Sequence, residues 1–281
     1  MMLLSVVFPL RPRQEAVIPA DQGRALAAEF LRWVQACDPA LSAALHDANA
    51  PRPYTVSGLR GASPHNGQVR LRPDRPVWWR LTTLTPALSQ VVRERVLPSL
   101  PPTVTLGEAV FERLPPLLTA AEHPWAGQTT YEELAAGALL QARRPRRLTL
   151  HFASPTTFHS RERHQPFPLP ELVFRQWLEK WNAFAPAAFP PGVLTFVEEA
   201  LAVSHYRLES RVVRFGEALF IGFSGHCTYR FLSHDAYWQR VVQALAQYAF
   251  FCGTGAKTVF GLGQTRLLAP AETSSVSGFS P

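Results

Sequence analysis

A glycine-rich loop near the C-terminal end has the most distinctive spacing in the chain: residues 252–263 read CGTGAKTVFGLG. Its glycines are Gly253, Gly255, Gly261 and Gly263, and its single cation is Lys257. Glycines adopt positive φ and let another backbone approach closely, and successive N–H groups in such a loop form a concavity that binds anions. The loop therefore predicts an anion-binding site, with a plain glycine-rich turn as the alternative.

The same loop does not fit a nucleotide-binding P-loop. That motif needs glycines where this chain has Ala256 and Phe251, and it follows a strand and opens a helix. Here the loop follows a predicted helix and runs into a predicted strand. A nucleotide-binding enzyme is therefore the weakest of the functions we consider.

Arginine dominates the positive charge of the chain. The formal net charge is +7, and of the 28 basic residues only Lys180 and Lys257 are lysines. Six arginines and a single acid lie between Arg52 and Arg80, and Arg143-Arg144-Pro145-Arg146-Arg147 forms a second cluster. Because the guanidinium group fits phosphate and stacks on bases, we expect a nucleic-acid partner. Genome base composition is the alternative source of this bias.

Histidine exchanges protons close to neutral pH, and nine histidines compete for an acid–base role. His46 ends a short predicted helix just before Arg52, and the C-terminal end of a helix favours an imidazolium. The segment His159-Ser160-Arg161-Glu162-Arg163-His164 is a rival site, for which we expect ligand contact more than catalysis. For the remaining strand histidines we expect packing or surface roles: His151, His205 and His226.

The sequence contains few residues at the spacings of a metal site. The dipeptides His46-Asp47 and His234-Asp235 lack the further His and Asp of a metal site, and there is no DxD or HExxH. The three cysteines are far apart with no CxxC, which predicts a protein without disulfides in a reducing cytoplasm. No apolar run approaches the ~20 residues of a membrane span. We therefore expect no metal, no cofactor and no membrane contact.

The pattern of the sequence predicts an α+β fold in which the same order of strands and helices occurs twice, and these elements position the residues above. The first set is a strand at 3–10, a helix from Asp21, a helix at 39–46 capped by Asp38, strands at 53–61 and 76–85, a helix at 86–97 and a strand at 103–114. The second set is a strand at 147–153, a helix at 169–184, a hairpin of 201–215 and 218–231 turning at Gly216, a helix at 233–251 and a strand at 259–268. Each set has the β-α-β-β-α-β order of a ferredoxin-like domain.

The expected organisation is therefore a tandem of ferredoxin-like domains. We place the first domain at residues 1–118 and the second, with the glycine loop, at 147–269. A linker with one helix occupies 119–146, and a disordered tail occupies 270–281.

Several segments together resemble one known family. The glycine loop is similar to the C-terminal glycine-rich signature of the CRISPR-associated repeat-RNA endoribonucleases, the Cas-six family of the RAMP superfamily. Residues 152–158, FASPTTF, resemble a strand end of that family, and residues 168–181 resemble the helix that follows it. Leu45-His46-Asp47 followed by YTVSGL at 54–59 resembles its N-terminal stretch. The resemblance extends to about Leu268.

This resemblance implies metal-independent cleavage of CRISPR repeat RNA (pre-crRNA) through attack of the 2′-hydroxyl, which matures guide RNAs for antiviral defence. The products carry a 2′,3′-cyclic phosphate and a 5′-hydroxyl. His46 matches the catalytic histidine of the family, and Arg52 stands nearest to the position of a family lysine. Arginine can stabilise a phosphorane but cannot act as a general acid. Some members use a tyrosine on the first long helix, where this chain has Phe30 and Trp33, so the second catalytic partner is open.

The expected partner is the repeat RNA, with other Cas effector subunits and a homodimer left open. We expect RNA contacts from the glycine loop and from the arginine clusters: Gly253, Gly255, Lys257, Gly261, Gly263, Arg161, Arg163, Arg144 and Arg146. The main alternative is a non-catalytic RAMP subunit that holds CRISPR RNA in an effector complex.

Overall fold

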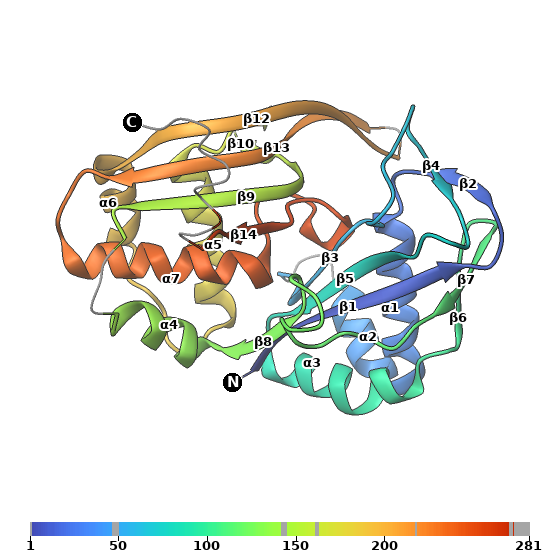
Figure 1. Ribbon diagram of the computed structural model, residues 1–281. Coiled ribbons are helices and arrows are strands. Elements are labelled where there is room, and N and C mark those ends of the chain that lie inside the picture. Colours follow the sequence, from blue (N-terminus) through green and yellow to red (C-terminus); the bar gives the residue numbers. More distant parts are fainter. Residues whose placement is uncertain are drawn as a thin grey trace. The chain divides into compact units, whose positions relative to one another are not determined.

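The computed structural model describes residues 2–46, 51–141, 145–160, 163–216, 218–269 and 272. The chain forms two compact units (Figure 1). The N-terminal unit comprises Met1–Thr130 together with Lys257–Leu262. The C-terminal unit comprises Tyr131–Ala256 together with Gly263–Pro281. Six residues of the glycine loop therefore belong to the N-terminal unit.

The N-terminal unit is an antiparallel sheet with helices on one face. Its strands are β1 (Met2–Pro12), β2 (Ala16–Pro19), β3 (Tyr54–Val56), β4 (Gln68–Leu71), β5 (Val77–Thr83), β6 (Thr103–Leu106), β7 (Ala109–Arg113) and β8 (Gly127–Thr130). Its helices are α1 (Gly23–Cys37), α2 (Pro39–His46) and α3 (Pro86–Val91), with the single turns η1 (Val92–Val96), η2 (Leu97–Ser99) and η3 (Thr258–Phe260).

The N-terminal sheet has the strand order β3-β5-β1-β7-β6, with β8 also paired to β1. The first, second, third and fourth strands of a ferredoxin-like unit are here β1, β3, β5 and β7. Alternate residues of β1 enter the core, where Phe8 stacks on Trp79 at 4.6 Å and meets Trp33 of α1 at 5.4 Å. This aromatic cluster holds α1 against the sheet.

The C-terminal unit repeats this plan. Its strands are β9 (Arg147–Thr156), β10 (Phe158–Ser160), β11 (Arg163–Gln165), β12 (Leu201–Phe215), β13 (Ala218–Phe231) and β14 (Thr265–Leu267). Its helices are α4 (Tyr131–Leu139), α5 (Pro170–Phe184), α6 (Gly192–Ala200) and α7 (Ala236–Cys252). The sheet order β12-β13-β9-β14 again places the fourth strand beside the first and the third beside the second. The predicted α+β class and tandem ferredoxin-like arrangement are therefore confirmed.

Several predicted elements match the structure and others do not. The helix at 39–46 and the hairpin strands at 201–215 and 218–231 have the predicted bounds. The single strand predicted at 103–114 is wrong, because Gly107, with φ +61°, turns the chain into the hairpin β6–β7. The strand predicted at 259–268 is also wrong at its start, because η3 occupies that position and only Thr265–Leu267 pairs with β9.

The proline-rich segment before α4 runs beside β1 in the plane of the N-terminal sheet, and its Trp125 contacts side chains of the sheet face. Val7 and Leu117 pair through their backbones, and the Ser5 hydroxyl donates to the carbonyl of Trp125 at 2.6 Å. Arg80 of β5 is 1% exposed and donates to that same carbonyl at 3.0 Å. Residues up to Thr130 thus belong to the N-terminal unit. Of the tail predicted as disordered, only Glu272 lies within the described residues.

Candidate active site and glycine loop

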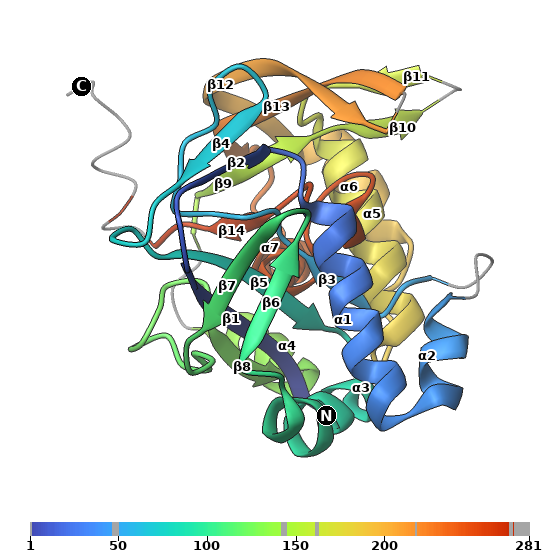
Figure 2. The same cartoon turned by 90° about the vertical axis from the view of Figure 1, so that its right-hand side faces the viewer.

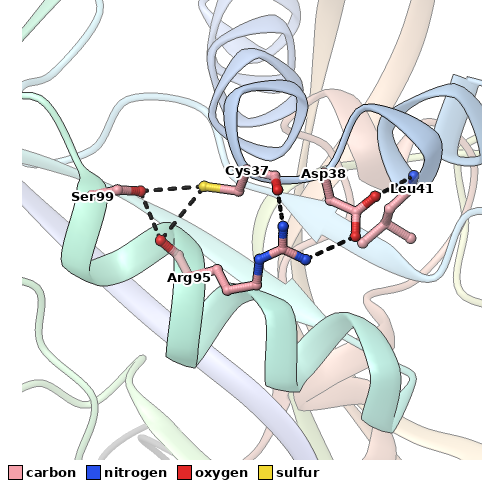
Figure 3. A network of polar contacts seen from close by, with 5 residues as sticks. All are labelled: Cys37, Asp38, Leu41, Arg95 and Ser99. Carbon is pink, nitrogen blue, oxygen red and sulfur yellow. Dashed lines mark hydrogen bonds and ion pairs between the residues drawn. The ribbon is translucent and has the colours of Figure 1, made fainter.

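The helix that carries His46 is anchored at its start (Figure 3). Asp38 accepts the N–H of Leu41 at 3.0 Å and so caps α2 as predicted. The guanidinium of Arg95, from η1, donates to Asp38 at 3.0 Å and also to the carbonyl of Cys37. The Leu41 N–H, together with the Arg95 guanidinium, lowers the pKa of Asp38. The first turn of α2 is thus fixed to the end of α1 and to η1.

Within α2, the chain turns back along α1, and the two helices lie side by side (Figure 2). The Ser42 hydroxyl donates to the carbonyl of Leu31 at 3.4 Å, and Leu45 enters the core cluster. Ser42 and Leu45, three residues apart, lie on the inward face of the helix, and His46 is exposed at the last position of α2. The sequence predicted that His46 ends this helix.

The His46 ring has a defined orientation. Its Nδ1 lies 2.9 Å from the carbonyl oxygen of Ser42. Because a carbonyl only accepts hydrogen bonds, Nδ1 carries the proton of this contact. In the neutral ring, Nε2 then has the lone pair that can take a proton, which is the state a general base requires.

Arg52 lies at the C-terminal end of the same helix. Its guanidinium donates to the carbonyl of Leu45 at 2.5 Å and to the carbonyl of His46 at 3.3 Å. It also hydrogen-bonds the hydroxyl of Tyr54, whose pKa is raised by burial. A cation at this place offsets the negative end of the helix. The structure thus places the Arg52 guanidinium at the end of α2, against the backbone carbonyl of His46, where it holds the helix.

The glycine loop is closed largely by the chain's own backbone. The Thr254 N–H donates to the carbonyl of Gly263 at 2.8 Å and so joins the two ends of the loop. Further N–H groups of the segment donate to backbone carbonyls: Gly253 to Ala249, Ala256 to Thr157, Phe260 to Lys257, and Gly263 to Pro155. These donors are directed at the protein and are not available to a ligand.

The four loop glycines, Gly253, Gly255, Gly261 and Gly263, are buried. A Cβ at Gly255, which has φ +81°, would lie 2.4 Å from the carbonyl oxygen of Thr157. Gly255 therefore allows the loop to approach the end of β9, where the FASPTTF segment lies. The glycine spacing thus has a structural cause, and direct RNA contact by these residues stays a prediction.

Lys257 is the half-buried cation of the loop. Its backbone is left-handed, with φ +60°, a conformation uncommon for residues with a side chain. Its segment, Lys257–Leu262, belongs to the same unit as His46 and Arg52. The turn η3 contacts both α1 and β3, and Ser57 forms a parallel bridge with Gly261.

The other predicted RNA contacts lie in the C-terminal unit or outside the described residues. Arg163 is exposed on the small hairpin β10–β11, where His159 faces His164. Arg146 is exposed just before β9. Arg144 and Arg161 lie outside the described residues.

The second His-Asp dipeptide and two of the strand histidines have structural partners in the C-terminal unit. Asp235 of the second His-Asp dipeptide accepts the N–H groups of Tyr237 and Trp238 and so caps α7. Within the described residues, no three His, Cys, Asp or Glu side chains are grouped to hold a metal ion. His151 and His226, for which the sequence predicts packing or surface roles, stack with ring centroids 4.5 Å apart. In the described part of the chain, no helix is long and apolar enough to span a bilayer.

Comparisons with known proteins agree over most of the chain. Residues 150–265 match the family described as CRISPR-associated endoribonuclease Cas6, and residues 2–136 match the Cas6 N-terminal domain. Two Mycobacterium tuberculosis proteins named CRISPR-associated endoribonuclease Cas6 are 29% identical over 130 residues, which is 45% of this chain. The match spans only 41% of the length of these curated relatives.

Solved structures extend the likeness to almost the whole chain. A Cas6 product complex is 29% identical with a TM-score of 0.78, covering 95% of this chain and 100% of that one. Thermus thermophilus Cas6 is 30% identical with a TM-score of 0.71, covering 95% and 98%. A Cas6 substrate mimic complex is 27% identical with a TM-score of 0.71, covering 95% and 100%.

Proposed function

Because the chain belongs to the CRISPR-associated endoribonuclease Cas6 family, we propose that it cleaves CRISPR repeat RNA within each repeat. The proposal is carried by His46, an exposed imidazole whose ring is oriented by the carbonyl of Ser42 and whose own backbone carbonyl accepts from the Arg52 guanidinium. Similar solved structures include a product complex and a substrate mimic complex of two Cas6 proteins, and the curated relatives are named endoribonucleases, which supports RNA as the substrate class.

In the proposed reaction the 2′-hydroxyl of the RNA is the nucleophile. Nε2 of His46 takes its proton, the 2′-oxygen bonds to the adjacent phosphorus, and the bond from phosphorus to the 5′-oxygen breaks. The leaving 5′-oxygen takes a proton from solvent. The products are a 2′,3′-cyclic phosphate and a 5′-hydroxyl, and the reaction needs no added ion.

Arg52 supplies positive charge beside the phosphorane. Its contacts to the carbonyls of Leu45 and His46 hold the guanidinium at the end of α2, so its position is fixed before RNA binds. Because arginine stays protonated, Arg52 stabilises negative charge and takes no part in proton transfer. The half-buried Lys257 and the exposed Arg163 and Arg146 are the proposed RNA contacts from the remaining described candidates.

Incubation of the protein with repeat RNA from its own locus, in EDTA, tests the proposal. We expect one cut per repeat, a 5′-hydroxyl that polynucleotide kinase labels directly, and a cyclic phosphate at the other end. A 2′-deoxy substitution at the cut position removes the nucleophile and is expected to stop cleavage without loss of binding. Tight binding with no cleavage would instead favour a non-catalytic crRNA-holding subunit.

A further inference from the structure

We propose that the face of the C-terminal sheet opposite α5 and α7 binds the phosphodiester backbone of a single-stranded RNA segment, through a row of side chains that crosses all four strands. The row runs from β12 through β13 and β9 to β14. Its members are Arg207, His226, His151 and Arg266. The assignment of RNA as the ligand rests on the proposed function, whereas the anion-binding row itself follows from the strand register.

The register places the four residues side by side. Arg207 pairs with His226, His226 pairs with His151, and His151 pairs with Arg266. Directly opposed residues of neighbouring strands point to the same face of a sheet. The row is therefore perpendicular to the strands and has an arginine at each end.

This face is the one that the helices leave uncovered. Tyr229 of β13 is buried and contacts Phe174 of α5 at 5.8 Å. Because side chains alternate along a strand, His226 lies on the other face. In Figure 1, α7 runs along one side of the sheet only. Arg207 is exposed, and both His151 and His226 are partly exposed.

A hollow lies beside the row. Its volume is about 450 Å³, and Arg207, His226, His151 and Ser224 are among the residues that line it. The register of β13 against β9 shifts between Phe223 and Gly225, as in a β-bulge. A Cβ at Gly225, which has φ +127°, would lie 2.1 Å from the carbonyl oxygen of Arg207. Glycine at this position lets β12 and β13 approach and adds no side chain to the hollow.

The chemistry of the row suits a phosphodiester. Two guanidinium groups offer forked donors to phosphate oxygens, and imidazole rings stack on unpaired bases. The rings of His151 and His226 are 14° from parallel, with centroids 4.5 Å apart. The one acid lining the hollow, Glu209, pairs with Arg211 at 3.0 Å, and Arg266 pairs with Glu272 at 3.0 Å. A bound phosphate therefore meets net positive charge, with Glu272 as its competitor for Arg266.

Proton uptake is expected to accompany binding. Burial, followed by the charges of Arg207 and Arg266, lowers the pKa of His226, so the free site holds a neutral ring at pH 7. Among the described residues, the other titratable groups on this face near His226 are the His151 ring, which stacks on it, and His205 and Glu209, which flank Arg207 on β12. An anion in the hollow stabilises the imidazolium, whereas repulsion between stacked rings limits the pair to one added proton. RNA affinity should therefore rise as the pH falls from 8 to 5.5.

The test measures binding of a fluorescein-labelled oligouridylate of 12 nucleotides by anisotropy. For Arg207→Gln we expect about tenfold weaker binding and a salt slope smaller by about 0.7, the value for one lost phosphate contact on a single strand. For His226→Gln, and separately for His151→Gln, we expect the pH dependence to flatten. The matched control is Arg175→Gln on α5, an exposed arginine of the same unit on the covered side of the sheet.

The outcomes separate the site from the proposed function. Unchanged affinity and pH dependence in the Arg207 and histidine variants would overturn the site, whatever happens to cleavage. Displacement of the oligonucleotide by equimolar inorganic phosphate would overturn the RNA assignment in favour of a free-anion site. A wild-type protein that fails to cut repeat RNA, while the oligouridylate results are as expected, would overturn the proposed function alone. Thermal unfolding of each variant shows whether the fold is retained.

Discussion

Gly23, the first residue of α1, lies directly against the backbone of Phe260 in the glycine loop. A Cβ at Gly23 would be 1.9 Å from the carbonyl oxygen of Phe260 and 3.0 Å from the N atom of Gly261. The start of α1 and the turn η3 are therefore in backbone contact, which no side chain can enter without moving one of them.

This contact predicts an unusual cost for the smallest substitution. We expect Gly23→Ala to lower the free energy of unfolding by about 1–3 kcal/mol, the range for overpacked sites. Gly58→Ala is the matched control, because a Cβ there meets nothing within 4 Å although Gly58 also borders Gly261. Urea denaturation of both variants measures the difference. Equal stability of the two would contradict the packing argument.

Replacement of His46 tests its proposed role as a base. We expect His46→Ala to slow single-turnover cleavage by about 10²–10⁴-fold, the usual contribution of a general acid or base. Binding of the uncut RNA should stay close to wild type, since the ring is exposed and its loss opens no cavity. His65→Ala, an exposed histidine of the same unit, is the control. Wild-type turnover in His46→Ala would remove this residue from the mechanism.

Substitutions of Arg52 separate charge from helix capping. Arg52→Gln removes the charge and the two contacts to the carbonyls of Leu45 and His46. We expect slower cleavage, with partial recovery in Arg52→Lys, which keeps the charge but not the fork. Hydrogen exchange in α2 distinguishes the two roles. Faster exchange at the end of α2 in both variants, with equal loss of activity, would make Arg52 a positioning residue only.

Acid titration tests the anchor of α2. The folded-state pKa of Asp38 is lowered, so its carboxylate stabilises the fold above the ordinary value of 3.8. This contribution is lost as the pH falls below 3.8 through the folded-state pKa. We expect wild type to be more stable than Asp38→Asn at pH 6, with a difference that vanishes toward pH 2. A difference that grows on acidification would refute this sign.

Lys257 offers a substitution that removes charge without a cost in backbone strain. Its φ of +60° suits glycine, so Lys257→Gly should keep or raise stability. We expect weaker binding of repeat RNA and a smaller salt dependence, whereas Lys257→Arg should retain both. Filter binding at salt concentrations from about 50 to 200 mM measures both quantities, because affinity that depends on phosphate contacts falls over this range. Equal affinity of the two variants would limit the loop to a structural role.

The sequence was sufficient where local signals decide the structure. Asp38 followed by proline defined α2, and Gly216 between two alternating runs defined the hairpin of β12 and β13. It was insufficient where a turn interrupts a pattern of suitable strand residues. Gly107 divides one predicted strand in two, and the turn η3 begins at Thr258 although Val259 and Phe260 are good strand formers.

The candidate site shows the same division. His46 and Arg52 are close in sequence, so their proximity could be predicted. The row from Arg207 to Arg266 could not, because it depends on the register between strands that are far apart in the chain. Nor could the burial of the loop glycines, because their neighbours come from β9 and α1.

The assignment of Lys257–Leu262 to the N-terminal unit bears on any attempt to take the protein apart. A chain cut after Thr130 would yield a first fragment without the residues that cover Gly23 and pair with Ser57. The second fragment would contain the whole C-terminal unit but would carry Lys257–Leu262 without their packing partners, so the two units should not separate cleanly at that point.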